Sequence, residues 1–120
     1  MEQKDMVVLF TVDPKKDLER ASMGLSVANA ALATDVKVKI FFALDGIFTL
    51  VKGHCEGLKA DHFVAVQELL ELFAEEGGEL HACSPFMAQR KISEGDLIAG
   101  VTISSAPTLV HDASGGVITS

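Results

Sequence analysis

The stretch that decides the fold class reads Met6-Val7-Val8-Leu9-Phe10-Thr11-Val12, an almost continuous apolar run rich in β-branched residues. Such a run is typical of a strand buried on both faces, as in a parallel sheet covered by helices. Asp13-Pro14 follows directly, and Asp as N-cap with Pro at the first helical position predicts that a helix begins there. Apolar side chains then recur at helical spacing and predict one buried helix face, made by Leu18, Ala21, Leu25, Ala28 and Leu32.

Strands and helices alternate along the rest of the chain. Further strands are predicted at Val36–Phe42, Glu79–Cys83, Val101–Ser104 and Gly116–Ser120. Helices are predicted at Phe63–Glu76 and, as shorter segments, at Ile47–Lys52, Phe86–Lys91 and Pro107–Ala113. This alternation is typical of βαβ units and a mostly parallel sheet. We therefore expect an α/β fold, a three-layer sandwich around a mostly parallel five-stranded sheet, in a single domain spanning residues 1–120.

Composition and charge exclude several classes of function. The chain has 120 residues, 48% of them apolar, and its 17 acidic and 10 basic side chains give a net charge of −7. A protein that binds nucleic acid needs a basic face to displace counterions, so nucleic acid is not an expected partner. No apolar run is long enough to cross a bilayer, and the charged residues 1–5 do not resemble a signal peptide. We expect a cytoplasmic protein without membrane insertion, whose two cysteines stay reduced.

The familiar nucleotide and hydrolase motifs are absent from the sequence. The first strand-to-helix turn, residues 11–17, has neither the glycines of a dinucleotide-binding motif nor those of a P-loop. Lys15 and Lys16 in that turn are interpreted as solvated charges at a helix start. No G-x-S-x-G elbow occurs, so a hydrolase triad is not indicated. We therefore expect no cofactor.

Cys83 is the strongest candidate for a chemical role. It ends a predicted strand, and open parallel sheets bind ligands at the carboxyl ends of their strands. Pro85 follows at the start of a short helix, whose N-terminus is expected to lower the pKa of the thiol. His81 lies two residues earlier, on the same side of the strand, as either a neighbouring base or a partly buried polar residue. The alternative for Cys83 is a small buried hydrophobic side chain, the usual environment of a free cysteine.

The other polar candidates carry weaker signals. Cys55 sits beside His54 in a predicted polar loop and is interpreted as an incidental loop cysteine. A redox pair of Cys55 with Cys83 would require Cα atoms within about 7 Å. The histidines and cysteines show no paired zinc-ligand spacing, so no metal site is expected. Asp45, after the second strand, either faces the site or belongs to an Asp-Gly turn with Gly46.

Four segments, in this order, carry a resemblance to a known family. They are Asp13-Pro14 opening a helix that ends at Ala30–Ala33, then Val38–Phe42 followed by Asp45-Gly46-Ile47, then Gly78–Ser84, and finally Ile92-Ser93 leading to Asp96–Val101. Together they resemble the DsrE-like sulfur-relay family, which includes DsrE/DsrF/DsrH, TusB/TusC/TusD and YchN-like proteins. Residues 38–48 look closest to the second DsrE subgroup, the DsrE-two type.

The resemblance implies a function, a site and an assembly. It implies an intracellular sulfur carrier or sulfurtransferase that holds sulfane sulfur as a persulfide on Cys83 and passes it to a partner thiol. His81, Ser84 and Asp45 are the neighbours expected around that thiol. The implied partners are further copies of the chain, in a homotrimer or homohexamer, together with sulfur donor and acceptor proteins. The alternative is a non-catalytic oligomeric interaction subunit, or a small-ligand-binding module, of the same fold.

Overall fold

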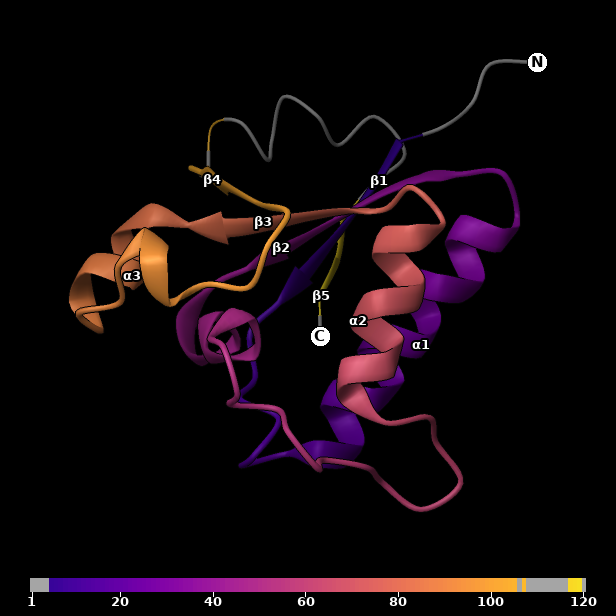
Figure 1. The fold of residues 1–120 in the computed structure, drawn as a ribbon. Coiled ribbons are helices and arrows are strands. Elements are labelled where there is room, and N and C mark those ends of the chain that lie inside the picture. Colours follow the sequence, from indigo (N-terminus) through magenta and orange to yellow (C-terminus); the bar gives the residue numbers. More distant parts are fainter. Residues whose placement is uncertain (1–4, 106, 108–116, 120) are drawn as a thin grey trace.

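Parallel strands form the centre of the computed structural model, which describes residues 5–105, 107 and 117–119. Four of them lie in the order β4-β3-β2-β1, and β5 extends the sheet beyond β1 (Figure 1). Every strand pair is parallel, so the α/β class and the parallel sheet are confirmed. The strands span β1 Asp5–Phe10, β2 Lys37–Phe42, β3 Glu79–Cys83, β4 Val101–Ser104 and β5 Val117–Thr119.

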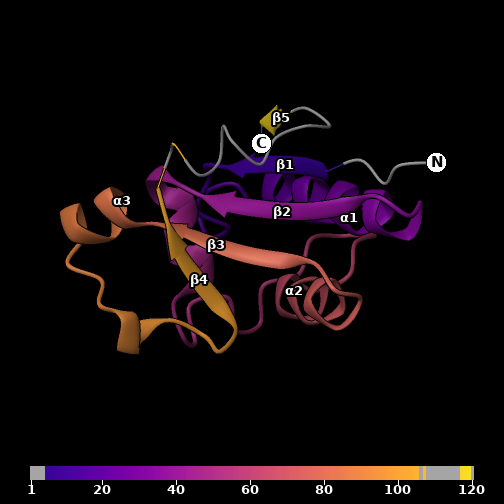
Figure 2. The ribbon, with the colours of Figure 1, turned by 90° about the horizontal axis from the view of Figure 1, so that it is seen from above.

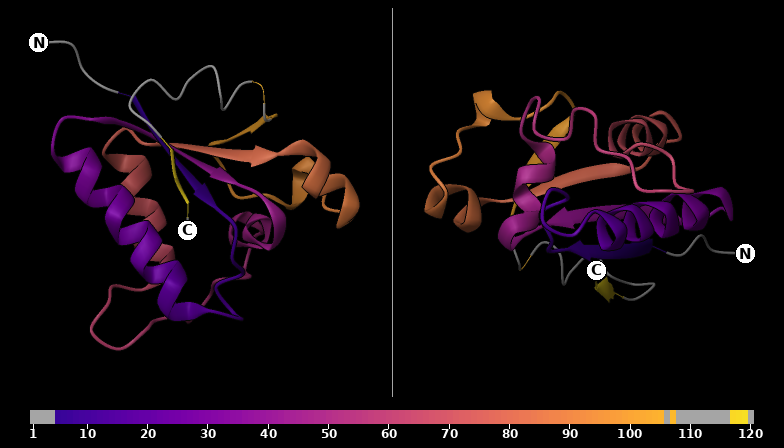
Figure 3. Two further views of the ribbon diagram at one scale, coloured as in Figure 1. Left: turned by 180° about the vertical axis from the view of Figure 1, so that it is seen from behind. Right: turned by 90° about the horizontal axis from the view of Figure 1, so that it is seen from below.

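Two long helices cover one face of this sheet. They are α1 (Leu18–Ala33) and α2 (Val66–Glu75), which pack side by side (Figure 3, left). Side chains of both helices and of strands β1, β2 and β3 share one buried core, which includes Leu25, Ala28, Leu69, Phe73, Val8, Phe10, Ile40 and Phe42. Complete burial of a side chain such as Phe10 contributes about 1.5–3 kcal/mol to folding.

Side-chain alternation along the strands separates two environments. In β1, Val8 and Phe10 join the core under the helices, whereas Val7 packs in a smaller cluster on the opposite face. The same period of two divides β3, where Leu80 and Ala82 face the helices. The sheet twists strongly from β1 to β4, as the view from above shows (Figure 2).

The predicted third layer is not found in the described part of the chain. Both long helices lie on the same face, so the described elements form two layers there. The predicted helix Pro107–Ala113 lies outside the described residues except for its first position. None of the described helices has both the length and the hydropathy to cross a membrane.

Three shorter helices complete the described elements. They are the 3-10 helices η1 (Leu44–Leu50) and η2 (Glu94–Asp96), and the α-helix α3 (Ser84–Gln89). η1 begins three residues before the predicted helix Ile47–Lys52, and α3 begins two residues before Phe86. Cys83 is therefore both the last residue of β3 and the N-cap of α3.

Two predicted helix starts are wrong. α1 begins at Leu18, four residues after Pro14, and its N-cap is Asp17, whose Oδ1 accepts the Arg20 N–H at 3.1 Å. Asp13 does not cap α1 because its carboxylate is held elsewhere, by the Lys15 N–H and by His54. α2 begins at Val66 rather than at Phe63.

Gly46 fixes η1 against the end of β1. The Ala43 N–H donates to the carbonyl oxygen of Phe10 at 3.0 Å, which ties the chain after β2 to the last residue of β1. A Cβ atom on Gly46 would come within 2.2 Å of that same Phe10 oxygen. Only glycine allows this close approach, and the approach places Asp45 at the carboxyl edge of the sheet.

We expect Gly46→Ala to lower the free energy of unfolding by about 1–3 kcal/mol, because the added methyl group displaces backbone. Gly95→Ala is the matched control, since its Cβ would meet nothing closer than the Ser93 Oγ at 3.9 Å. Urea denaturation followed by circular dichroism measures both variants. Equal midpoints for wild type and Gly46→Ala would contradict this account of the turn.

Candidate functional site

Cys83 lies on the face of the sheet opposite to α1 and α2. It is only 5% exposed and packs in a small cluster with Val7, Phe41 and Ala43, with Phe86 of α3 against it. The residue thus occupies the predicted carboxyl end of a central strand. Its position between β3 and α3 follows from the local sequence, because Pro85 supplies a favourable first turn for a helix.

Burial raises the pKa of the Cys83 thiol above its ordinary value. The Phe86 backbone N–H in the first turn of α3 opposes this rise, although the Cys83 side chain makes no capping hydrogen bond. The expected net lowering of the thiol pKa by the helix N-terminus is therefore wrong, because desolvation outweighs it. At neutral pH the resting form is the neutral thiol.

His81 shares the face of Cys83, as its spacing predicted. It is 5% exposed and stacks on Phe41, with ring centroids 5.9 Å apart and an interplanar angle of 9°. Its Nδ1 lies 2.7 Å from the Ser104 Oγ, and its Nε2 lies 3.2 Å from the Glu79 Oε1. Ser104 was missed by sequence reasoning because the contact depends on the pairing of β3 with β4.

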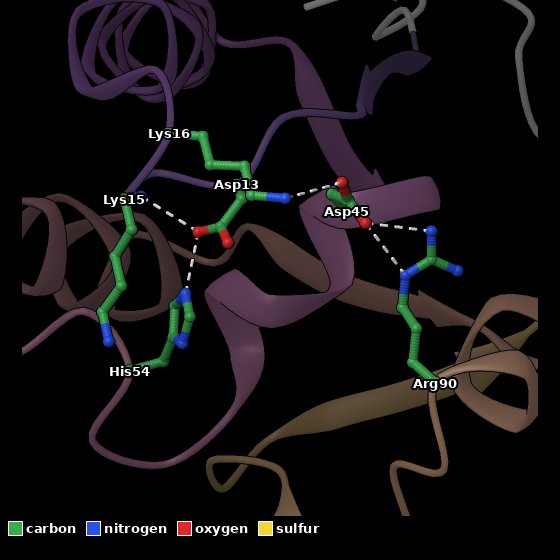
Figure 4. Close-up of polar contacts among 6 residues, drawn as sticks. All are labelled: Asp13, Lys15, Lys16, Asp45, His54 and Arg90. Atoms are coloured by element: carbon green, nitrogen blue, oxygen red, sulfur yellow. Dashed lines mark hydrogen bonds and ion pairs between the residues drawn. The ribbon is translucent and has the colours of Figure 1, made fainter.

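Ser84 directly follows Cys83, whereas Asp45 is bound by two basic side chains. Ser84 is exposed in the first turn of α3. The Asp45 Oδ1 accepts hydrogen bonds from Arg90 Nε and Nη2 at 3.1 and 3.0 Å, and its Oδ2 pairs with Lys16 Nζ at 3.7 Å (Figure 4). The Arg90 Nη1 also donates to the carbonyl oxygen of Phe86 at 3.3 Å. Asp45 therefore anchors α3 to η1.

A second polar contact at this edge of the sheet was not predicted. The His54 Nε2 and the Asp13 Oδ1 are 2.7 Å apart, and that oxygen also accepts the Lys15 N–H at 2.9 Å (Figure 4). Asp13 is buried at the end of the β1 segment, and Phe48 stacks on the His54 ring at 5.5 Å. This pair joins the loop after η1 to the turn after β1.

Cys55 lies in the loop after η1, as predicted, and its side chain is buried. Its Sγ donates to the Thr49 carbonyl oxygen at 3.6 Å, and burial, assisted by the Asp13 charge, raises the pKa of the thiol to about 11. Cys55 packs in the core under the helices, so the sheet separates it from Cys83. A direct redox pair of the two thiols is thereby ruled out.

A pocket of about 330 Å³ opens beside Cys55. Its lining is mostly apolar and includes Val51, Leu70, Leu80 and Ile98. Leu80 faces the helices, so this pocket lies on the opposite side of the sheet from Cys83. Within residues 5–105 and the shorter described pieces, no three histidine, cysteine or acidic side chains gather as metal ligands would.

Comparison with known protein families matches residues 4–116 to the DsrE/DsrF-like family. The chain belongs to this family. An uncharacterized protein of Methanopyrus kandleri is 35% identical over 107 residues, covering 89% of this chain and 85% of that protein. An uncharacterized protein of Methanocaldococcus jannaschii is 29% identical over 107 residues, but these make up only 39% of its length.

Solved structures agree with the fold of this DsrE/DsrF-like chain. The ychN protein of E. coli has a TM-score of 0.74 at 21% identity, over 99% of this chain and 100% of that one. A protein of unknown function from Methanobacterium thermoautotrophicum has a TM-score of 0.70 at 14% identity, with the same coverage. At these identities the likeness establishes a YchN-like fold.

The Asp45–Arg90 pair generates a prediction about pH. The Arg90 hydrogen bonds hold the pKa of the Asp45 carboxyl below its usual range, so the pair stabilises the fold above about pH 4. That stability is lost as the pH falls through the lowered pKa. Because the Asp45 side chain is 42% exposed, we expect Asp45→Asn to cost under about 1 kcal/mol at pH 7.

Urea denaturation at pH 7 and at pH 2.5 measures this difference. The gap between wild type and Asp45→Asn is expected to shrink at the lower pH and in high salt. Glu75→Gln, on the exposed face of α2, is the matched control. A gap that widens as the pH falls would contradict the assigned role of the ion pair.

Proposed function

We propose that this protein is a sulfur carrier that holds sulfane sulfur as a persulfide on Cys83 and passes it to the thiol of a partner. The observation that carries this proposal is the position of Cys83, at the carboxyl end of β3 and the N-cap of α3, in a chain of the DsrE/DsrF-like family. Residues 78–84 also resemble the segment in which family members carry the reactive cysteine.

The chemistry is an exchange of sulfur between thiols. The Cys83 thiolate attacks the outer sulfur of a donor persulfide, forming one S–S bond while the donor's S–S bond breaks. The donor leaves as a thiolate and takes up the proton that Cys83 lost. The acceptor thiol then repeats the exchange on the Cys83 persulfide, so the two steps involve no net oxidation.

The buried position of Cys83 suits a carrier. A persulfide held among Val7, Phe41 and Phe86 is shielded from water and from stray thiols. The same burial keeps the resting thiol protonated and unreactive. Loading then requires a donor that reaches the site, together with a local acceptor for the thiol proton.

A compartment, an oligomeric state and partner proteins are also proposed. We place it in the cytoplasm, where thiols stay reduced, as a homotrimer or homohexamer that meets sulfur donor and acceptor proteins. Apolar side chains suited to contacts between subunits stand exposed, namely Met23, Leu44, Val64, Leu72 and Ile103.

A small-ligand-binding module is the second candidate function. The pocket of about 330 Å³ beside Cys55 favours it, because its volume falls in the range of small-molecule sites. Loading of sulfur on Cys83 distinguishes the two candidate functions. Only the carrier requires it, since Cys83 is not part of that pocket.

Loading with inorganic polysulfide, followed by mass spectrometry of the intact chain and of its peptides, tests the carrier. We expect the mass gain of one sulfur atom on the peptide with Cys83 in wild type and in Cys55→Ser, and none in Cys83→Ser. Cys55 is an internal control, because a thiol with a pKa of about 11 is almost wholly protonated at pH 7.

A wild-type Cys83 that stays unmodified, under conditions that load a known persulfide carrier, would overturn the proposal. Sulfur found on Cys55 instead would also overturn it.

A further inference from the structure

A chain of polar side chains runs along the sheet face that bears Cys83. It consists of Glu79, His81 and Ser104, linked by the 3.2 Å contact at His81 Nε2 and the 2.7 Å contact at His81 Nδ1. His81 is buried and stacked on Phe41, which fixes the plane of its ring. Glu79 is the solvent end of the chain, because its side chain is 53% exposed.

The chemistry of the three groups sets the direction of the hydrogen bonds. A carboxylate only accepts, so His81 Nε2 carries the hydrogen that is donated to Glu79. The neutral imidazole then has Nδ1 as its acceptor, and the Ser104 hydroxyl donates to it. A hydroxyl oxygen that donates its hydrogen retains lone pairs for a further donor.

The strand register places Cys83 next to this hydroxyl. Cys83 and Ser104 are direct partners in the pairing of β3 with β4, and each ends its strand. Ser104 must project on the face of His81 in order to reach its ring, and Cys83 projects there too, two residues beyond His81. Neighbouring strands lie about 4.8 Å apart, so the two side chains stand side by side.

We propose that Ser104, His81 and Glu79 form a proton relay that takes the thiol proton of Cys83 when sulfur is loaded. The purpose of the relay rests on the proposed sulfur carrier, but the relay itself acts on any electrophile that Cys83 attacks. Ser104, the register partner of Cys83, is the group that accepts the thiol proton. His81 is the proton acceptor, and Glu79 is a positioning residue that sets its tautomer.

The step balances without a further reactant. The Cys83 S–H bond breaks and its proton passes to the Ser104 Oγ, while the Ser104 proton passes to His81 Nδ1. The electron pair stays on sulfur, which becomes the thiolate nucleophile. The imidazolium is stabilised by Glu79, and it later returns its proton to the departing donor thiolate.

Other charges near the relay come from neighbouring elements. On β2, Lys39 is the register partner of Glu79, and Lys37 lies two residues before it on the same face. On α3, Arg90 is engaged with Asp45. On β1, Asp5 is the register partner of Lys37 on the same face, and Glu79 is the acidic group in contact with His81.

The rate of Cys83 alkylation by iodoacetamide, read by peptide mass spectrometry between pH 6 and pH 10, tests the relay. We expect Ser104→Ala to slow alkylation about tenfold or more at pH 7, because general base assistance is typically worth at least that factor. The rates of variant and wild type should converge at high pH, where the thiolate forms without a base. Ser104→Thr, which keeps the hydroxyl, should restore most of the rate.

Two further variants test the role of His81 and control for the loss of a hydroxyl group. His81→Gln should show the same shift of the pH profile as Ser104→Ala. Thr102→Ala is the matched control, because it removes a hydroxyl from the same strand and face outside the relay. Thermal unfolding identifies any variant that fails to fold. If His81→Gln fails to fold, the Ser104→Ala variant still tests the relay, because Ser104 is only half-buried.

Alkylation profiles of Ser104→Ala that match wild type at every pH would overturn the relay, even if Cys83 loads sulfur. A shifted profile supports the relay even if wild type takes no sulfur from polysulfide, a result that defeats only the carrier. A slowing that is equal at pH 7 and at pH 10 points to a structural role of Ser104 and also overturns the relay.

Discussion

The alternation of side chains along β3, fixed by its parallel pairing with β2 and β4, is the constraint on which the site depends. Leu80 and Ala82 must enter the core under the helices, since that burial stabilises the sheet. His81 and Cys83 are thereby committed to the other face. A slip of one residue would exchange these pairs, bury a histidine under α2 and remove the thiol from Ser104. Stability of the core and geometry of the site are thus set by the same register.

The turns at the carboxyl ends of the strands hold the elements around Cys83 in place. Gly46 lets η1 approach the end of β1, and Asp45 then stands where Arg90 reaches it. Because Arg90 also binds the Phe86 carbonyl oxygen, this ion pair connects η1 to the helix that starts beside the thiol. Asp45 therefore holds in place the helix whose N-cap is Cys83.

The sequence correctly predicted those elements whose boundaries are set by residues close together in the chain. β3 and β4 occupy the predicted residues, because a short apolar run between turn residues leaves little choice of boundary. The start of α1 was missed because Asp13 is bound by His54, 41 positions away, and no local signal reveals that contact. Ser104 was missed for the same reason, since its role depends on the β3–β4 register. The pKa of Cys83 was mispredicted because burial outweighs the helix N-terminus.

A proton path from Cys83 to His81 requires that the Ser104 hydroxyl donates to His81, which is possible only for one tautomer of the neutral ring. Nitrogen-15 NMR of imidazole-labelled protein distinguishes the tautomers directly. We predict that neutral His81 carries its hydrogen on Nε2, toward Glu79, with an unprotonated Nδ1 toward Ser104. A hydrogen found on Nδ1 would contradict the account, because the ring would then donate to Ser104 and no proton path would lead from Cys83 to His81.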